Sequence, residues 1–260
     1  LNWGCIPTKA LIKSGRVAAL VRDAGQFGVH VTGSSIDYGA MSARKDKVVS
    51  VLRGGIEALF KGRGIRLVTG VARLASADSV EVSLTGGGVE TLEGRAVILA
   101  TGSRPSRPPV FQFDGQAVLT SQEAVAKTSV GKSVIIVGGG FIGCEYAALY
   151  ANLGLEVTVV ELLDSILSTM DADVVKEIAR AFRKRKIKVR TGVKVEKLTA
   201  DNGGAAAHLA GGEKLSADFA LVSVGRVPVT DGLGLEALGV ACERGFVSID
   251  DRCRTSVQSI

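Results

Sequence analysis

The sequence predicts an α/β protein in which parallel strands alternate with helices and antiparallel meanders add further strands. Residues 131–161 provide the first observation: a strand, a glycine-rich turn, a helix and a second strand follow one another directly. The second observation is a set of short strand-like runs between residues 66 and 92, separated by turns. With 260 residues and 46% hydrophobic side chains, the chain can form two domains, or one large domain and one partial domain.

Two helices are predicted before the first strand. Pro7 suits the first turn of a helix, where its missing N–H has no partner to lose, and Leu11 and Ile12 continue that helix. A longer helix is predicted over 38–61. Its apolar stripe, which indicates one buried face, consists of Val48, Val49, Leu52, Ile56, Leu59 and Phe60.

An antiparallel meander is predicted next, with strands at 66–74, 80–84 and 89–92 and a turn of three glycines between the last two. A further buried strand is predicted over 96–100. The proline-rich segment 104–109 is the clearest break in the chain, and we interpret it as a linker between domains.

Gly138, Gly140 and Gly143 fit the pattern G-x-G-x-x-G between a strand at 134–137 and a helix at 141–153. The first glycine permits a tight turn, the second lets a pyrophosphate approach the backbone, and the third lets helix and strand pack closely. The N–H groups and positive dipole end of the helix then face the phosphate. The pattern predicts a dinucleotide site; the alternative is a glycine-rich turn that binds no ligand.

Glu161 follows the second strand of this unit, 156–160, where a carboxylate can bind the ribose diol of an adenosine. This carboxylate would repel a 2′-phosphate. Leu162, Leu163 and Asp164 supply no basic partner for such a phosphate. The sequence therefore predicts NAD rather than NADP.

The remaining chain continues the alternation of helix and strand. A helix with apolar residues at helical spacing is predicted around 174–182. Strands are predicted over 188–198, 205–209, 219–224 and 245–250, the first two forming a hairpin around Asn202, Gly203 and Gly204.

Charge and cysteine content exclude several classes of protein. The net charge is +6, and its densest basic block, 180–190, is interpreted as a solvated helix face whose cations suit the C-terminal dipole. Nucleic-acid binding is not expected, because no interleaved aromatics accompany the block. No apolar run approaches the roughly 18 residues of a membrane span. The cysteines Cys5, Cys144, Cys242 and Cys253 show neither a disulfide-scaffold nor a metal-site spacing.

Cys5 lies just ahead of the first predicted helix, and Lys9 follows about one turn later. Both features favour a reactive thiolate. A lone cysteine is also commonly a small buried hydrophobe, and the residues alone leave both interpretations open.

Five segments in order resemble the flavin-dependent pyridine nucleotide–disulfide oxidoreductases: LNWGCIPTK (1–9), ATGS (100–103), GGGFIGCE (138–145), VTVVE (157–161) and SVGRVP (223–228). Residues 44–61, 161–174 and 225–240 look most like the dihydrolipoamide dehydrogenase branch. The resemblance implies two Rossmann-like FAD/NAD(P)-binding domains, each a parallel sheet with helices plus a three-stranded antiparallel meander. We expect 1–109 to be a partial FAD domain, 110–240 the NAD domain, and 241–260 the start of the return to the FAD or central domain.

The resemblance also implies a reaction, dihydrolipoamide + NAD⁺ to lipoamide + NADH, within 2-oxoacid dehydrogenase or glycine cleavage complexes. Cys5 matches the second cysteine of the active C-x-x-x-x-C pair, whose thiolate contacts the flavin. Lys9 matches a lysine near the flavin, and Glu145 matches the glutamate that pairs with it. We therefore predict that the charged groups of Lys9 and Glu145 lie within about 6 Å of each other.

Further cofactor contacts are implied by the same resemblance. Phe141 either shields the flavin until nicotinamide enters or is a core aromatic, and Cys144 is interpreted as helix packing. The implied FAD contacts are Gly70, Thr101, Gly102 and Ser103. The implied NAD contacts are Gly138, Gly139, Gly140, Phe141, Ile142, Gly143, Cys144, Glu145, Glu161, Val193 and Gly225.

Several parts of the family pattern are expected outside this sequence. They are the first active cysteine immediately before Leu1, the N-terminal glycine fingerprint for FAD, a Gly-Asp flavin motif beyond Ile260, and a C-terminal dimerisation domain with a His–Glu pair. His30 and His208 lie in the wrong segments to replace that pair. The resemblance thus indicates an internal fragment, which we expect to be inactive alone.

The expected partners of the full-length parent are the lipoyl domain of an acyltransferase or carrier protein and a second copy in a homodimer, with no nucleic acid and no membrane. The expected location is the cytoplasm, or an organelle matrix or stroma if a targeting segment was lost. Two alternatives stay open: an isolated NAD-binding module without catalysis, and a related enzyme of the glutathione or mercuric reductase type.

Overall fold

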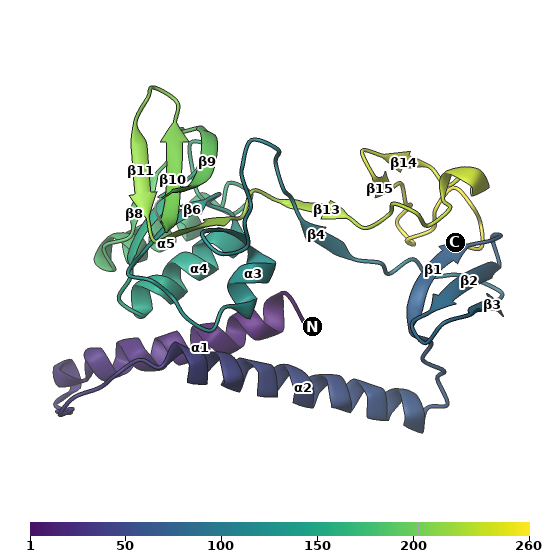
Figure 1. Cartoon of the computed structure of the whole chain (residues 1–260), viewed down its shortest axis with the longest axis horizontal. Helices are drawn as coiled ribbons and strands as arrows, with labels where there is room; N and C mark the ends of the chain where they lie inside the picture. Colours follow the sequence, from purple (N-terminus) through teal and green to yellow (C-terminus); the bar gives the residue numbers. More distant parts are fainter. Residues whose placement is uncertain (202) are drawn as a thin grey trace. The chain divides into compact units, whose positions relative to one another are not determined.

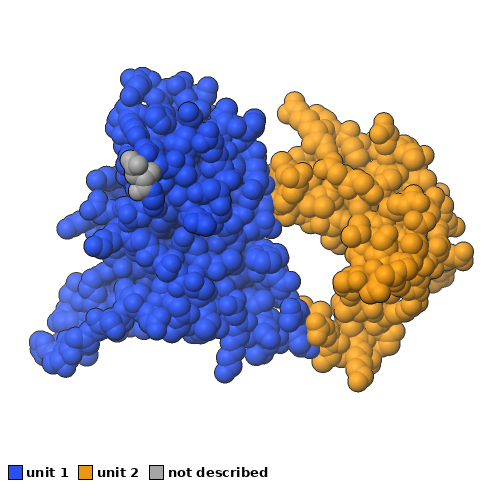
Figure 2. All heavy atoms as spheres, viewed as in Figure 1, with its two compact units in different colours: residues 1–55, 105–225 blue, residues 56–104, 226–260 orange. Residues whose placement is uncertain are grey.

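The computed structural model describes residues 1–201 and 203–260, so the predicted turn residue Asn202 lies outside the described residues. The chain forms two compact units (Figure 2). The first consists of Leu1–Gly55 and Pro105–Gly225, and the second of Ile56–Arg104 and Arg226–Ile260. The predicted break at 104–109 contains the point where the first unit resumes. These units reflect packing within this chain, and the division into an FAD part and an NAD part stays a prediction.

A five-stranded parallel sheet forms the centre of the first unit (Figure 1). Its strands, in spatial order, are β5 (Val118–Thr120), β12 (Phe219–Val222), β6 (Ser133–Val137), β7 (Glu156–Val160) and β8 (Lys188–Arg190). Every residue of β5 and β12 is buried. Continuous apolar strands of this kind are typical of a parallel sheet covered on both faces.

Alternate side chains of β6 enter two different cores. Val134 and Ile136 join a core with the helices on one face, whereas Ile135 and Val137 join a core with an antiparallel meander on the other. The meander consists of β9 (Val195–Asp201), β10 (Gly204–Leu209) and β11 (Lys214–Ala217). The fully buried Tyr146, Leu149 and Tyr150 lie in the helical core.

The helices of the first unit are α1 (Cys5–Arg22), the short 3₁₀ helix Ala24–Phe27, α2 (Tyr38–Gly62, which continues into the second unit), α3 (Ser121–Ala126), α4 (Phe141–Asn152) and α5 (Ala172–Lys184). Helix α1 packs against α4, with Leu11 fully buried in the shared core. This packing brings the residues around Cys5 to the glycine-turn helix.

The second unit is built from a meander of β1 (Gly70–Leu74), β2 (Ser79–Leu84) and β3 (Val89–Glu93). A small core around Leu74, Leu235, Val240 and Ile260 holds it together. The other elements are the pair β4 (Ser103–Pro105) and β13 (Arg226–Pro228), the pair β14 (Cys242–Glu243) and β15 (Phe246–Val247), and the 3₁₀ helix Glu236–Leu238.

Three strand predictions were wrong. Segment 96–100 is not a strand, and the Ile98 side chain is 88% exposed, because no strand in the described part of the chain pairs with it. The run 188–198 divides at Gly192, whose φ of +68° ends β8 before β9 begins in a different sheet. Only two residues of 245–250 pair, as β15 with β14.

Helices α4 and α5 end in the same Schellman motif, but with different residues at its left-handed position. Gly154 (φ +89°) holds that position after α4, and Lys186 (φ +59°) holds it after α5. The next residues close both motifs: Leu155 N–H donates to Tyr150 O and Ile187 N–H to Phe182 O, each at 3.0 Å. A residue with a Cβ in this conformation costs about 1 kcal/mol or more relative to glycine.

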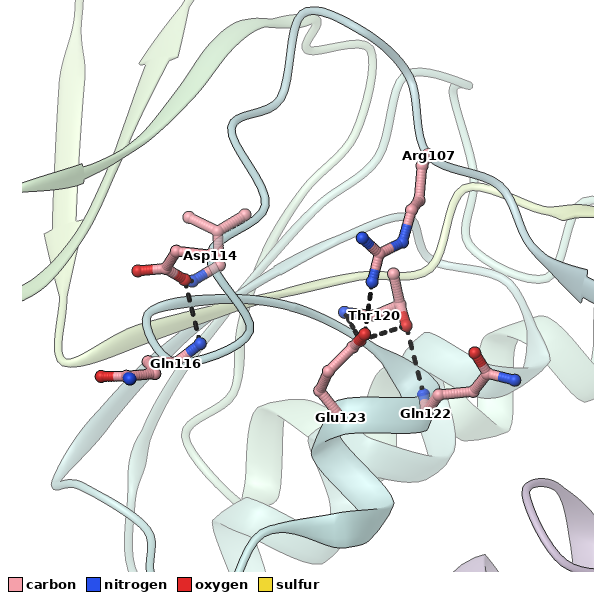
Figure 3. Close-up of polar contacts among 7 residues, drawn as sticks. Arg107, Asp114, Gln116, Thr120, Gln122 and Glu123 are labelled. Carbon is pink, nitrogen blue, oxygen red and sulfur yellow. Dashed lines mark hydrogen bonds and ion pairs between the residues drawn. The ribbon is translucent and has the colours of Figure 1, made fainter.

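Helix α3 begins with a capping box (Figure 3). The Thr120 hydroxyl accepts a hydrogen bond from Gln122 N–H at 3.3 Å, and the Glu123 carboxylate accepts one from Thr120 N–H at 2.8 Å. Arg107 forms an ion pair with the same carboxylate. Partial burial alone would raise the pKa of Glu123, but the hydrogen bonds from Thr120 and the charge of Arg107 outweigh it and lower that pKa.

We therefore expect Glu123→Gln to lower the free energy of unfolding by about 1 kcal/mol at pH 7. A lowered folded-state pKa stabilises the fold above the unfolded value and loses this effect as pH falls through the folded value. The difference between variant and wild type should accordingly shrink below about pH 4.5. Urea denaturation at several pH values measures it. Glu177→Gln, on an exposed face of α5, should show no comparable loss, and an unchanged Glu123→Gln stability at pH 7 would contradict the prediction.

Candidate functional site

The three motif glycines occupy the turn between β6 and α4, and each has a distinct geometry. Gly138 has a φ of +104°, and a Cβ there would lie 2.5 Å from Ser223 O. At Gly143 a Cβ would lie 2.0 Å from Gly138 O. Gly140 has an ordinary φ of −73° and open space where its Cβ would be. Two of the glycines are therefore required by packing, whereas Gly140 keeps a surface clear beside the N-terminus of α4.

Glu161 is oriented toward this turn by two backbone donors. Its carboxylate accepts hydrogen bonds from Gly139 N–H at 2.5 Å and from Leu163 N–H at 2.8 Å. The main chain is fixed too, since Glu161 N–H donates to Arg190 O at 2.8 Å and Val193 N–H donates to Glu161 O at 3.0 Å. The structure thus brings together Val193, Glu161 and the glycine turn at the carboxyl edge of the sheet.

These features fit a bound dinucleotide. Ligands of open parallel sheets bind beyond the carboxyl ends of the strands, and phosphates bind at helix N-termini. The open face of Gly140 leaves room for close approach, and Glu161 supplies the carboxylate for a ribose. Sequence reasoning missed Ser223, whose hydroxyl donates to Gly138 O at 2.9 Å and joins the end of β12 to the turn. Its position in SVGRVP was the available signal.

Cys144 is buried within α4, and its Sγ donates to Gly139 O at 3.2 Å. Burial raises the pKa of the thiol to about 12, and the nearby carboxylates of Glu161 and Glu145 contribute further. These contacts agree with a packing role. Ile142 packs partly buried against the helical core.

We expect Cys144 to resist alkylation by a maleimide at pH 8 in the folded, reduced protein, because the buried thiol stays protonated. Cys242 and Cys253 are exposed and should react readily. Mass spectrometry of tryptic peptides, before and after unfolding in urea, distinguishes the sites. Rapid labelling of Cys144 without unfolding would contradict the structure.

Phe141 is the first residue of α4, and its side chain is 58% exposed. The interpretation as a core aromatic was therefore wrong. The shielding role stays a prediction.

Cys5 is the first residue of α1 and is exposed, so its interpretation as a buried hydrophobe was wrong. Near it, the Thr8 hydroxyl donates to Gly4 O at 2.8 Å. Lys9 Nζ lies 2.5 Å from Glu145 Oε1, which confirms the predicted pairing. The ion pair connects the helix that begins at Cys5 with the helix of the glycine turn.

The other implied flavin residues lie in the second unit. A Cβ on Gly70 would lie 2.3 Å from Ser83 O, so its pairing with β2 requires a glycine. Gly102 has a φ of +73° and accepts a hydrogen bond from Val229 N–H at 3.1 Å. Ser103 Oγ accepts one from Arg226 Nε at 2.8 Å, a contact that the sequence did not predict. Thr101 is exposed. Their cofactor roles stay predictions.

Gly225 ends the first unit with a φ of +117°, and its carbonyl accepts a hydrogen bond from Ser106 N–H at 3.0 Å. Its predicted NAD contact is untested by this geometry. Across the described residues, no three His, Cys, Asp or Glu side chains gather in a way that could hold a metal ion. Among the helices of this part of the chain, none combines the length and apolar character needed to cross a bilayer.

Comparisons with known proteins match this chain to one family along its whole length. The family model for pyridine nucleotide-disulphide oxidoreductases matches residues 1–260. Dihydrolipoyl dehydrogenase of Chlorobaculum tepidum is 39% identical over 264 residues, which cover 100% of this chain and 56% of that protein. The protein of the same name from Bacillus subtilis is 38% identical over 276 residues, covering 100% and 58%.

Solved structures show the same fold. LpdA from Mycobacterium tuberculosis superposes with a TM-score of 0.92 at 25% identity, covering 99% of this chain and 57% of that one. The HOCl-induced flavoprotein disulfide reductase RclA from Escherichia coli has a TM-score of 0.82 at 26% identity, covering 99% and 55%. The chain spans about half the length of the relatives that it matches. It belongs to the pyridine nucleotide-disulphide oxidoreductase family.

Proposed function

We propose that this chain is part of a dihydrolipoyl dehydrogenase, an enzyme that oxidises dihydrolipoamide and reduces NAD⁺. The observation that carries the proposal is the Lys9–Glu145 ion pair, which joins the helix of Cys5 to the helix of the glycine turn. Such a tie holds a thiol site and a dinucleotide site in one packed unit. FAD and NAD are the cofactors of the family.

The glycine turn and Glu161 are the residues that would hold NAD. The N–H groups at the start of α4 suit its pyrophosphate, and the Glu161 carboxylate suits the adenosine ribose. That carboxylate disfavours a 2′-phosphate, which supports NAD over NADP. When bound, FAD supplies two-electron transfer between the thiol pair and the nicotinamide.

The overall reaction balances without a further reactant. Oxidation of the two thiols of dihydrolipoamide to a disulfide releases two electrons and two protons. NAD⁺ takes up both electrons and one proton as a hydride, and the second proton goes to solvent. In the proposal Cys5 forms a disulfide with a second cysteine that we expect immediately before Leu1. The two thiols of dihydrolipoamide reduce this disulfide by thiol–disulfide exchange and leave as the disulfide of lipoamide, and the two electrons then held by the protein's thiol pair go on to NAD⁺. Lys9, held by Glu145, would supply positive charge that stabilises the reduced flavin.

The proposed partners follow from the relatives named dihydrolipoyl dehydrogenase. We propose that a lipoyl domain delivers the substrate and that the full-length protein is a homodimer. Its proposed location is the cytoplasm, or the matrix or stroma of an organelle.

The test uses the full-length protein that contains this chain. Dihydrolipoamide should drive NADH formation, measured by absorbance, and Cys5→Ser should lower the rate at least about 10³-fold. Cys253→Ser, at another exposed cysteine, serves as the matched control and should keep full activity. A preference for glutathione disulfide or mercuric ion with NADPH would overturn the proposal. So would NADH binding with no turnover of any dithiol, the behaviour of a non-catalytic module.

A further inference from the structure

A basic cavity lies at the amino-terminal edge of the parallel sheet, opposite the glycine turn. Strands β7 and β8 begin there, at Glu156 and Lys188, whereas the glycine turn follows the carboxyl end of β6. The cavity measures about 890 Å³, within the range of small-molecule sites. Its cationic lining residues are Arg22, Lys184, Arg185, Lys186 and Lys188.

Two of these cations are positioned by one buried residue. Asn152, at the end of α4, is only 6% exposed. Its side-chain Oδ1 accepts a hydrogen bond from Arg185 Nε at 3.3 Å, and its carbonyl accepts one from Arg22 Nη1 at 3.1 Å. Within the described residues, Nη2 of neither guanidinium has a hydrogen-bond partner. Preorganised guanidinium groups of this kind recognise the oxygens of phosphates and carboxylates.

The three lysines of the lining add uncompensated charge. Over the part of the chain that the structure describes, no ion pair engages Lys184, Lys186 or Lys188. The described residues of the lining include two carboxylates, Glu156 and Asp23. Asp23 Oδ1 lies 3.3 Å from Arg22 Nε and forms an ion pair with it. An adjoining cavity that shares Arg185 and Asn152 is lined by two more cations, Lys13 and Arg16. Concave surfaces lined by charge of one sign concentrate oppositely charged ligands.

One of these lysines, Lys186, has a strained backbone conformation. Both Schellman motifs described above line this cavity, through Gly154 after α4 and Lys186 after α5. Glycine would relieve the left-handed conformation at Lys186, as it does at Gly154. A strained residue that adds charge to a cavity points to a function for that charge.

We propose that this cavity binds an oligophosphate, a chain of three or more phosphate groups such as nucleoside triphosphates or inorganic polyphosphate carry. Several cations around one hollow match a compact ligand with several negative charges. The described residues that line this cavity include no aromatic side chain, and those of the adjoining cavity include one, Phe27. Because single strands stack successive bases on several aromatic side chains, this lining argues against a single-stranded nucleic acid. The site is separate from the proposed dinucleotide site, at the opposite edge of the sheet.

Isothermal titration of the full-length protein with inorganic tripolyphosphate, in about 0.1 M salt, tests the proposal. Saturating NAD⁺ keeps the dinucleotide site occupied throughout. Binding with one site per chain is expected. A parallel titration with ATP separates the sources: equal affinity assigns recognition to the phosphate chain, and tighter ATP binding adds a contact to the nucleoside.

Variants distinguish this site from general attraction to a basic protein. Lys188→Gln and Lys186→Gly should each weaken tripolyphosphate binding about tenfold. Lys186→Gly should also raise Tm by a few degrees, because it removes backbone strain, so its weaker binding cannot be attributed to misfolding. Lys176→Gln, on an exposed part of α5, is the matched control and should bind like wild type.

Three results would overturn the proposal: no tripolyphosphate binding to the wild type, equal weakening by Lys176→Gln, or tighter binding of a single-stranded oligonucleotide than of tripolyphosphate. None of them depends on dihydrolipoamide turnover, so the outcome is independent of the proposed enzyme activity.

Discussion

Gly143→Ala is expected to lower the free energy of unfolding by about 3 kcal/mol or more, and to abolish NADH binding with it. A Cβ at Gly143 would lie 2.0 Å from the carbonyl oxygen of Gly138 and 2.8 Å from Ser223 Oγ. The first contact is with backbone, which cannot rotate away as a side chain does. Gly138 is itself held by a hydrogen bond from its N–H to Val160 O at 2.9 Å. Relief would therefore require α4 to move away from the sheet.

Gly140→Ala provides the matched control, because the same methyl group is added three residues earlier. The φ of −73° accepts alanine, and apart from Gly140 and the two residues adjacent to it in the chain, no atom lies within 4 Å of the added Cβ. Stability should change by less than about 0.5 kcal/mol. NADH affinity should still fall at least about tenfold, since the methyl group would occupy the surface kept clear for the pyrophosphate.

Urea denaturation and NADH fluorescence titration of the full-length protein measure both effects. The expected pattern is a loss of stability and binding in Gly143→Ala, but of binding alone in Gly140→Ala. Undiminished NADH binding by Gly140→Ala would contradict a dinucleotide at this turn. Wild-type stability of Gly143→Ala would contradict the close packing of α4 on β6.

The parts of the fold predicted correctly from the sequence are those fixed by neighbouring residues. The glycine turn, α4 and β7 follow one another within 131–161. Glycines indicate the turn, helix-forming residues indicate α4, and β-branched residues indicate β7. The bounds of helix α2 were likewise predicted from its apolar spacing, but the expected burial of that stripe was wrong, since Leu52, Ile56 and Leu59 are 42%, 40% and 62% exposed. The ends of these elements agree closely with the structure because glycines and caps determine them locally.

Elements that depend on distant partners were missed or wrongly assigned. Strand β5 has three residues and is a strand only because β12, far along the chain, pairs with it. The apolar segment 96–100 had a strand-like composition, but pairing, not composition, defines a strand. Ser223 was missed as a site residue for the same reason, since its contact with the turn spans 85 residues.

The Lys9–Glu145 pair was predicted only through the family resemblance, and it supports the second large effect. Lys9→Met in the full-length protein should slow the reduction of bound flavin by dihydrolipoamide about 10²-fold, because it removes the positive charge proposed to lie beside the flavin. The free energy of unfolding should change by less than about 1 kcal/mol. The reason is exposure: the Lys9 and Glu145 side chains are 56% and 33% exposed, and water screens their attraction.

Stopped-flow absorbance of the flavin gives the rate, and urea denaturation gives the stability. Lys214→Met is the matched control, because Lys214 pairs with Asp201 at 2.7 Å with similar exposure, 47% and 38%, in the meander of the same unit. Lys214→Met should change the free energy of unfolding as little as Lys9→Met does, and its flavin should be reduced at the wild-type rate. Glu145→Gln should slow reduction less than Lys9→Met, and the double variant should be no slower than Lys9→Met, since the carboxylate acts through the lysine. Equal slowing by Lys214→Met would show that the effect of Lys9→Met is not specific to Lys9. Additive effects in the double variant would show that Glu145 does not act by holding Lys9.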